Sequence, residues 1–415
     1  MKKTLILYIF LFISQICVGQ AKINLINNCP LILSDVNYQE NEFIKEAATF
    51  LKDSEIVAMG EASHGASEFF TMRINFFKYL VENQGYRVFA IESTLATTYD
   101  LNKYLINGKG DAKSALSKLD NFYWYTEEVL ELIEWIYEFN NNKEVEEKIW
   151  FYGIDINSLY PSVQAISQYL NKVESEKENK YPNLSKLLLS KSISKEELKL
   201  EDTYSKHSDD YIGKTAKWEY DFIKQCFFNV RQTKVNRIFS NEYRDSCQAE
   251  NVAWIKEITD SKIFIWAHNY HISKYQIGNN KSMGYFLNEK YKDKYYNIGF
   301  DFKKGDIWAK KGSNVLTVIL NGNKNRTCKT NPPKPNTFTH LLGQLNYPVI
   351  FMEVNKCKGK NTDLDHLLDS EQKLHYSDEW FSKRKEYKNY NIRKSFDALI
   401  YIEKVTPTKH FRLGK

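Results

Sequence analysis

Residues 55–65 read Glu-Ile-Val-Ala-Met-Gly-Glu-Ala-Ser-His-Gly, and the expected architecture can be worked out from this stretch. Its first half, Glu55 to Met59, is a short apolar run with β-branched members, which is typical of a buried strand. Small and titratable residues follow at once, framed by Gly60 and Gly65, and then apolar residues recur at three and four from Glu68 to Gln84. A strand, a polar loop and a helix in this order predict the start of an α/β unit.

Similar apolar runs recur along the chain, each bounded by polar residues: Arg87 to Ile91, Lys148 to Gly153, Lys262 to Ala267, Tyr295 to Phe300, Tyr347 to Met352 and Phe396 to Ile402. Longer amphipathic segments, such as Thr126 to Asn140 and Asp209 to Thr259, lie between most of them. Strands that alternate with helices predict an α/β fold with a mostly parallel central sheet covered by helices.

The intervals between these predicted strands are uneven. Two of them are much longer than an ordinary crossover, which predicts helical insertions at about 96–146 and 158–260 that form a cap over the carboxyl ends of the strands. The part from Lys172 to Glu201 is the most polar, and we expect it to be a mobile helical hairpin. Residues 20–415 are therefore predicted to be one catalytic domain that carries these insertions.

The first residues have the composition of an export signal. Lys2 and Lys3 precede an apolar run that ends near Val18, and small residues suited to cleavage stand before Gln20. We therefore expect a signal peptide at 1–19 and an exported protein, periplasmic or secreted. A membrane anchor fits less well, because about 14 apolar residues fall short of the ~20 that span a bilayer. Lipidation of Cys17 is a further alternative, with a poor lipobox before it. No later stretch is long and apolar enough to cross a membrane, so no membrane span is expected after signal removal.

The composition limits the classes of partner. With 415 residues, 42% of them hydrophobic, the chain can bury a large core. Its 58 basic and 52 acidic residues are spread along the chain and no glycine-rich phosphate loop occurs, so no nucleic-acid partner is expected. The cysteines after the signal are irregularly spaced and form neither a disulfide framework nor a zinc site. The nearest pairs, Cys226 with Cys247 and Cys328 with Cys357, remain open as disulfides.

Titratable residues follow most of the predicted strands. In chain order, these are Glu61 and His64, Glu92, Asp155, His268 and His271, and Asp301. The carboxyl ends of parallel strands converge on one edge of a sheet, where ligands bind in open α/β folds. The sequence therefore predicts one site that includes three of the chain's eight histidines.

His64 is the candidate general base within that site. Gly60 and Gly65 allow a tight turn that presents Glu61 and His64 on the loop before the next helix. A carboxylate such as Glu61 orients a histidine and makes it more basic, which is what the removal of a proton from water requires. Arg73, nine residues beyond His64, can pair with Glu61 or with Glu92.

The same residues allow a metal-dependent alternative. Glu61-x-x-His64 and His268-x-x-His271 supply a carboxylate and up to three imidazoles, which can hold a divalent cation that activates water. The sequence does not separate metal-assisted from metal-free hydrolysis, and no other cofactor is expected. A serine nucleophile is disfavoured, because no Gly-x-Ser-x-Gly elbow occurs.

Beyond these patterns, the chain resembles the erythromycin esterase family. Matching blocks occur in family order and cover nearly everything after the signal: Gly60-Glu61-x-x-His64-Gly65, Arg73, Ile91-Glu92-Ser93, Tyr152-Gly153-Ile154-Asp155, Arg244-Asp245 with Asn251 and Trp254, Trp266-Ala267-His268-Asn269-x-His271, Met283-Gly284, Ile298-Gly299-Phe300 and Phe396-Asp397-Ala398-Leu399. Each block is modest alone, and their ordered combination is specific.

The resemblance implies a function. It implies hydrolysis of the lactone ester of a 14-membered macrolide such as erythromycin, by water activated at His64, and hence macrolide resistance. In the matching roles, Glu61 orients His64, while Arg73, Glu92, His268 and His271 complete the polar pocket and stabilise the oxyanion. Two alternatives stay open: a hydrolase of another ester or envelope-derived molecule, and a non-catalytic exported protein that binds a metal or haem.

Overall fold

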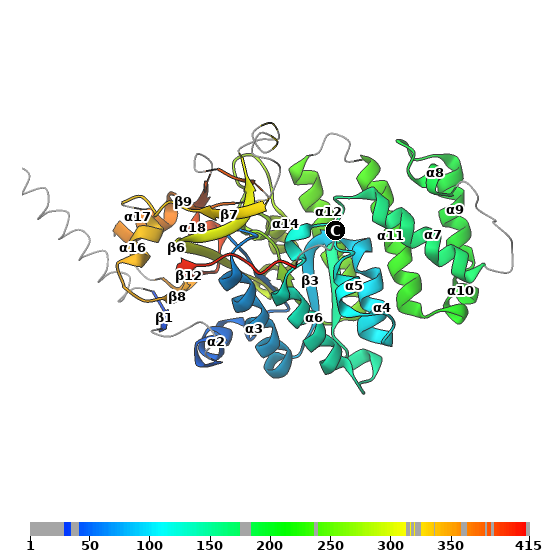
Figure 1. The fold of residues 1–415 in the computed structure, drawn as a ribbon, viewed down its shortest axis with the longest axis horizontal. Helices are drawn as coiled ribbons and strands as arrows, with labels where there is room; N and C mark the ends of the chain where they lie inside the picture. Colours follow the sequence, from blue (N-terminus) through cyan, green and yellow to red (C-terminus); the bar gives the residue numbers. More distant parts are fainter. Residues whose placement is uncertain are drawn as a thin grey trace, which may run out of the picture. The chain divides into compact units, whose positions relative to one another are not determined.

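A computed structural model describes most of the chain, namely residues 29–34, 41–174, 184–235, 240–312, 316, 319, 325–335, 337–357, 363–377, 380–382 and 386–411. The predicted signal peptide, residues 1–19, lies outside these described residues. The chain forms two compact units, which are described separately below (Figure 1). Unit 1 takes its described residues from Met1–Gly85 and Trp266–Arg412, and unit 2 takes its own from Tyr86–Ile265.

Parallel strands form the centre of unit 1. Strand β6 (Tyr295–Lys311) pairs in parallel with β2 (Ile56–Met59) on one side and with β12 (Ala398–Val405) on the other. β8 (Val349–Glu353) then pairs antiparallel with β12, and β1 (Leu31–Ser34) pairs antiparallel with β8. β2 and the first half of β6 are buried almost throughout, so the loop that follows β2 starts from a rigid support.

The other described elements of unit 1 are α2 (Asn41–Ala48), α3 (Ser67–Gln84), α13 (Asn269–Ile272), α14 (Met283–Tyr291), β7 (Asn325–Lys329), α16 (Phe338–Gly343), α17 (Asp363–Asp369), β9 (Glu371–His375), β10 (Trp380–Phe381), β11 (Tyr387–Asn391) and α18 (Ile392–Ser395). Of these, β7 and β10 join the sheet, because both pair with β6. β9 and β11 form a separate antiparallel ribbon of two strands.

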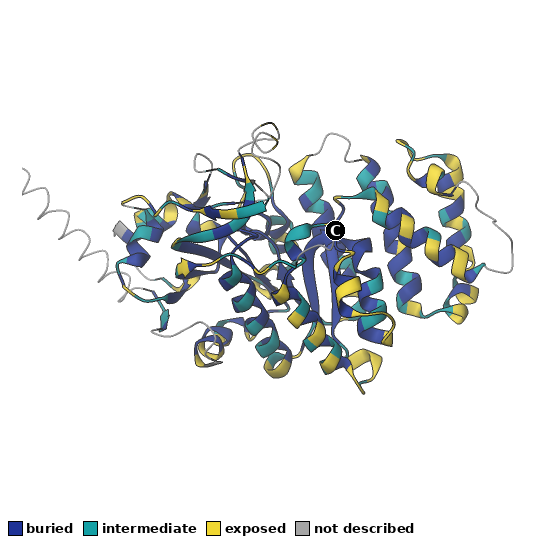
Figure 2. Cartoon of the chain, in the orientation of Figure 1, coloured by how far each residue is buried: buried dark blue, intermediate teal, exposed yellow. Residues whose placement is uncertain are grey.

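Unit 2 combines three sheet strands with many helices. β3 (Tyr86–Thr94) pairs in parallel with β4 (Trp150–Asp155), and β5 (Lys262–Trp266) neighbours β3, although its last residue belongs to unit 1. The helices are α4 (Tyr99–Asn107), α5 (Ala112–Leu116), α6 (Glu127–Asn140), α7 (Leu159–Val173), α8 (Leu184–Leu188), α9 (Lys195–Lys206), α10 (Ser208–Lys214), α11 (Lys217–Val235) and α12 (Asn241–Thr259). Figure 2 shows the strands buried and the helices exposed on their outer faces.

The α/β fold with a mostly parallel central sheet, predicted from the sequence, is confirmed. The described residues of the amphipathic stretch 209–259 lie mainly in helices α10, α11 and α12. Of the predicted hairpin 172–201, residues 175–183 lie outside the described residues, and the rest includes α8 and the start of α9. The placement of helical insertions as a cap stays a prediction.

The disulfide of the structure is one that the sequence did not single out. Cys29 and Cys357 form a disulfide across a sequence separation of 328 residues. The two pairs considered from the sequence are not formed, because Cys226, Cys247 and Cys328 are free thiols. Proximity in the sequence was the wrong guide, because β1 pairs with β8 and thereby brings two distant segments of the chain together. Among the described residues, no helix is both long enough and apolar enough to span a membrane.

Candidate active site

Glu61 and His64 form a buried hydrogen-bonded pair on the loop after β2. The Nδ1 atom of His64 lies 2.5 Å from Oε1 of Glu61, and the two residues are 3% and 0% exposed. An ionised carboxylate can only accept a hydrogen bond, so the shared proton belongs to Nδ1 of His64. The other ring nitrogen, Nε2, then carries the lone pair of a neutral imidazole and can take a proton from water.

Arg73 holds the second oxygen of Glu61. It lies on α3, is 0% exposed, and places Nη2 at 2.5 Å from Glu61 Oε2. Its Nε and Nη1 donate to the backbone oxygens of Phe69 and Gly60, both at 2.9 Å. The indole of Trp266 stacks under the guanidinium at 3.9 Å and donates from Nε1 to Glu61 Oε2 at 3.3 Å. Of the two carboxylates considered for Arg73, the one it pairs with is Glu61, and this pairing fixes the carboxylate that orients His64.

The charges of this group set its protonation. Burial by itself raises the pKa of Glu61, but the positive charge of Arg73 and the hydrogen bond from His64 bring that pKa below its ordinary value. Burial lowers the pKa of Arg73 to about 10, with Glu61 opposing the shift. At neutral pH Glu61 is therefore an anion and Arg73 a cation.

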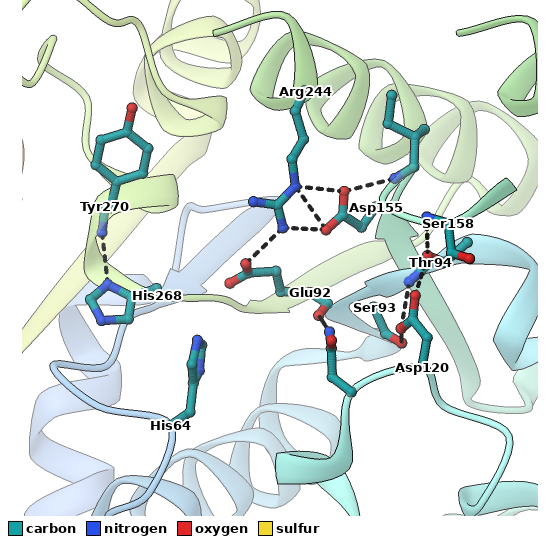
Figure 3. Close-up of polar contacts among 12 residues, drawn as sticks. His64, Glu92, Ser93, Thr94, Asp120, Asp155, Ser158, Arg244, His268 and Tyr270 are labelled. Atoms are coloured by element: carbon teal, nitrogen blue, oxygen red, sulfur yellow. Dashed lines mark hydrogen bonds and ion pairs between the residues drawn. The ribbon is translucent and has the colours of Figure 1, made fainter. Parts of the chain in front are cut away.

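His268 lies edge to face with His64, with ring centroids 5.4 Å apart. It stands directly before α13, where its Nδ1 accepts a hydrogen bond from the backbone N–H of Tyr270 at 3.3 Å (Figure 3). Because Nδ1 accepts, the proton of a neutral His268 is on Nε2, which makes that nitrogen a donor. The two predicted histidines therefore meet in unit 1, with the base nitrogen on one ring and an N–H donor on the other.

The neighbouring histidine and tyrosines complete the group. His271 lies on α13, 7% exposed, with its ring edge to face with Tyr270 at 5.1 Å. The ring of Tyr376, which follows β9, contacts the ring of His268 at 4.6 Å. The ring of His268 contacts the ring of His64, and the ring of His271 contacts the ring of Tyr270.

Glu92 belongs to a different cluster, in unit 2. It lies near the end of β3, and its Oε1 accepts a hydrogen bond from Nη2 of Arg244 on α12 at 3.0 Å (Figure 3). Arg244 also donates from Nε to both carboxylate oxygens of Asp155, at 3.0 and 3.1 Å. These two carboxylates raise the pKa of Arg244 well above its ordinary value, against the lowering effect of burial. The arrangement holds Glu92 in one orientation.

Asp301 was expected at a strand end, but it lies within β6, which continues to Lys311. Its carboxylate accepts hydrogen bonds from the backbone N–H and Nδ1 of His375, at 3.1 and 2.9 Å, and from Thr339. Asp301 therefore joins β9 to β6. The sequence missed this role because the polar residues after Phe300 resemble a loop, although they continue β6 and pair there with β12 and β7.

The metal alternative finds no assembled ligand set. Among the described residues, no group of three His, Cys, Asp or Glu side chains is arranged to hold a metal ion. Both oxygens of Glu61 are already bound, one by His64 and the other by Arg73. The residues present therefore fit a hydrogen-bonded base better than a metal centre.

The two glycines of the loop serve a different purpose from the one predicted. Neither Gly60 nor Gly65 has a positive φ, so the backbone turn does not require glycine. A Cβ at Gly60 would stand 2.1 Å from Oδ1 of Asn269, and one at Gly65 would stand 2.0 Å from the backbone oxygen of Trp308. Glycine is needed at both positions because the loop lies too close to α13 and β6 to leave room for a Cβ atom.

Gly65→Ala is expected to destabilise the protein by about 1–3 kcal/mol or more, the usual cost of overpacking, because the added Cβ meets backbone that cannot rotate away. Urea unfolding followed by circular dichroism measures this change. Gly213→Ala is the matched control, since its Cβ meets nothing within 4 Å on α10, and we expect it to stabilise by about 0.5–1 kcal/mol. Equal midpoints for the two variants would contradict the close-approach explanation.

Some residues of the group carried no functional signal in the sequence. The side chain of Asn269 exchanges two hydrogen bonds with the backbone of Phe300, at 2.7 and 3.0 Å, and the backbone N–H of Asn269 donates to the backbone oxygen of Glu61 at 3.0 Å. Trp266 and Asn269 stood in a matching block, but Tyr376 lies over 100 residues beyond His268 in an unremarkable segment. A residue whose role depends only on tertiary contacts leaves no periodicity or spacing to detect.

Comparison with known proteins gives a consistent picture. The model of the family described as Erythromycin esterase matches residues 81–405. The putative hydrolase YbfO of Bacillus subtilis is 26% identical over 427 residues, which covers 91% of this chain and 89% of that protein. Both coverages extend over most of the two proteins, so the likeness is not confined to one motif.

Solved structures show the same fold. A Bacillus cereus protein matches with a TM-score of 0.77 and 22% identity, over 95% of this chain and 99% of its own. A variant of the erythromycin esterase EreC, in its open conformation, matches with a TM-score of 0.63 and 14% identity, over 93% of this chain and 100% of its own. At these identities the two structures support the fold alone.

Proposed function

This chain belongs to the erythromycin esterase family and is therefore a hydrolase, and we propose that it opens the lactone ester of a 14-membered macrolide such as erythromycin. The observation that carries the proposal is the chain of contacts Arg73–Glu61–His64, with the ring of His268 against that of His64. It provides an oriented base and an adjacent hydrogen-bond donor, which are the two groups that hydrolysis by water needs.

The proposed reaction begins with proton transfer from water to Nε2 of His64, while the water oxygen attacks the ester carbonyl carbon. Negative charge then develops on the carbonyl oxygen, and the N–H of His268 is the donor proposed to stabilise it. Collapse of the tetrahedral intermediate breaks the bond to the ring oxygen, and His64 returns its proton to that leaving oxygen. The products are a carboxylic acid, which loses its proton to water at neutral pH, and an alcohol within one opened chain. Arg73 and Glu61 act by positioning His64.

The remaining predicted residues take narrower roles in this proposal. His271 supports Tyr270, whose N–H fixes Nδ1 of His268. Glu92 belongs to unit 2, where Arg244 holds its carboxylate. No step of the reaction is assigned to it.

Export is proposed as well. The Lys2-Lys3 start with its apolar run supports a signal peptide. The disulfide between Cys29 and Cys357 supports an oxidising compartment, because such bonds persist mainly outside the reducing cytosol. A periplasmic or secreted esterase of this kind could open macrolides before they enter the cell, which would confer resistance.

The test is a product assay. We expect purified protein to convert erythromycin into a product heavier by one water, seen by mass spectrometry, and His64→Ala to slow the conversion by at least about 100-fold. If several 14-membered macrolides are left unchanged while an activated ester is hydrolysed, the substrate is another ester and the macrolide proposal fails. If no ester is hydrolysed and the protein carries a stoichiometric metal or haem, the non-catalytic alternative replaces it.

A further inference from the structure

The β9–β11 ribbon brings a lysine to the histidine site. β9 and β11 pair antiparallel, so that Lys388 stands opposite Leu374. Lys388 is only partly exposed, and its ammonium lies over two aromatic rings, 3.8 Å from the centroid of Tyr270 and 4.6 Å from that of Tyr376. Both distances are well inside the ~6 Å range of a cation–π interaction.

The two rings that hold this ammonium are the neighbours of His268. Tyr270 donates its backbone N–H to His268 Nδ1 at 3.3 Å, and the ring of Tyr376 contacts the ring of His268 at 4.6 Å. One contact selects the tautomer of His268 and the other limits the rotation of its ring. A single side chain is therefore bound to both groups that define the geometry of His268.

Tyr376 is itself fixed on both sides in the sequence. The preceding residue, His375, bonds to Asp301 at 2.9 Å and stacks on Phe302 at 4.0 Å. The following residue, Ser377, donates its N–H to the oxygen of Ala62 at 2.8 Å, in the loop that carries Glu61 and His64. These contacts fix the backbone of Tyr376, so Lys388 can affect only the orientation of the Tyr376 ring.

We propose that Lys388 is a positioning residue of this site: by binding the faces of Tyr270 and Tyr376, it keeps His268 in one orientation and in the tautomer whose Nε2 carries the proton. Its effect on the rate rests on the proposed function, but its effect on the tautomer does not. A lysine side chain at a protein surface normally extends its ammonium into water, whereas the ammonium of Lys388 lies over the faces of two aromatic rings.

Three variants of Lys388 and one control variant test the proposal. Lys388→Met keeps the apolar stem and removes the charge, and Lys388→Arg keeps a cation that also binds aromatic faces. Lys373→Met is the matched control, because Lys373 lies on the other strand of the same ribbon and is exposed. Lys388→Gln is a second charge-free variant in case the methionine variant folds poorly.

The first measurement is steady-state hydrolysis of an ester that the wild type cleaves. We expect Lys388→Met to lower kcat by about 3- to 30-fold, the range that one cation–π contact implies, with little change in KM. Lys388→Arg should restore most of kcat, and Lys373→Met should match the wild type. If Lys388→Met keeps the wild-type kcat, or if Lys388→Arg loses as much as Lys388→Met, the proposal is overturned.

The second measurement is the ¹⁵N NMR signal of the His268 imidazole, assigned with His268→Gln. In the wild type, we expect one protonated and one unprotonated ring nitrogen, with Nδ1 unprotonated. In Lys388→Met, the two signals should move toward each other as the tautomers mix, and in Lys388→Arg they should stay apart. Unchanged signals in Lys388→Met overturn the inference. If the wild type hydrolyses nothing yet the signals still move, the proposed function fails and the role of Lys388 stands.

Discussion

His64→Ala is expected to lower kcat by at least about 100-fold while the fold survives, since general bases contribute roughly 10²–10⁴ to a rate. The variant removes the only proposed proton acceptor for water but leaves Arg73 bound to both the carboxylate of Glu61 and the oxygen of Gly60. The buried charge pair therefore stays compensated. KM should change little, because the base acts mainly in the transition state.

The measurement is the kcat of wild type and variant on the same ester, with circular dichroism to verify folding. His207→Ala serves as the control, because His207 is exposed at the end of α9, in unit 2, and should leave the rate unchanged. Added imidazole is expected to restore part of the lost rate, since it can occupy the space left by the missing ring. Turnover close to that of the wild type in His64→Ala, without imidazole, would exclude the role proposed for His64.

The sequence predicted the core of this site because its parts obey local rules. The apolar run before Gly60 forms β2, and the run before His268 forms β5, so each pattern located a strand and the residues at its end. Convergence of strand ends then predicted that His64 and His268 meet, and their rings are in contact. Residue type and strand position were sufficient for this much of the site.

Other parts of the site could not be predicted, because they depend on tertiary contacts. The stacking of Trp266 under Arg73 and the packing of Tyr376 on His268 each join segments that are distant in the sequence. The sequence placed the end of β6 too early for a related reason. The second half of β6 pairs with β7 and β10, and neither of these short strands was recognised as a strand in the sequence. In the same way, the partner of Cys29 in its disulfide is determined by the pairing of β1 with β8 and not by the distance between cysteines in the sequence.

Glu61→Gln is expected to cost about 3–5 kcal/mol of stability and about 10²–10⁴ in kcat, because it leaves a buried guanidinium without its counter-charge and a histidine without its orienting anion. Glu61 and Arg73 both have 0% side-chain exposure, so water cannot compensate the loss. The double variant Glu61→Gln with Arg73→Met should regain much of the stability, since both charges are gone, but none of the activity. Recovery of stability without recovery of kcat in the double variant would show that Glu61 has a role in the reaction in addition to its role in stability.

The stability difference should depend on pH with a definite sign. The folded-state pKa of Glu61 lies below its ordinary value of about 4.3, so ionised Glu61 stabilises the fold at every pH above that ordinary value. The contribution is lost as the pH falls through the lower folded-state pKa. Urea unfolding of wild type and Glu61→Gln should therefore show a difference in the free energy of unfolding at neutral pH that narrows as the pH falls below about 4.

The control for this experiment is Glu42→Gln on α2. Glu42 pairs with Lys45 at 3.4 Å, but both side chains are more than 60% exposed, and such surface pairs contribute only about 0–1 kcal/mol. If Glu61→Gln were as stable as Glu42→Gln, the buried ion pair of Glu61 and Arg73 would not contribute to stability. If the stability difference between wild type and Glu61→Gln grew as the pH fell, the predicted direction of the pH dependence would be wrong. The proposed base at His64 depends on the anion of Glu61, which Arg73 and Trp266 hold in place. If Glu61→Gln showed either of these stability results and also kept the wild-type kcat, His64 would not need that anion, and its proposed role as a base would lose its physical basis.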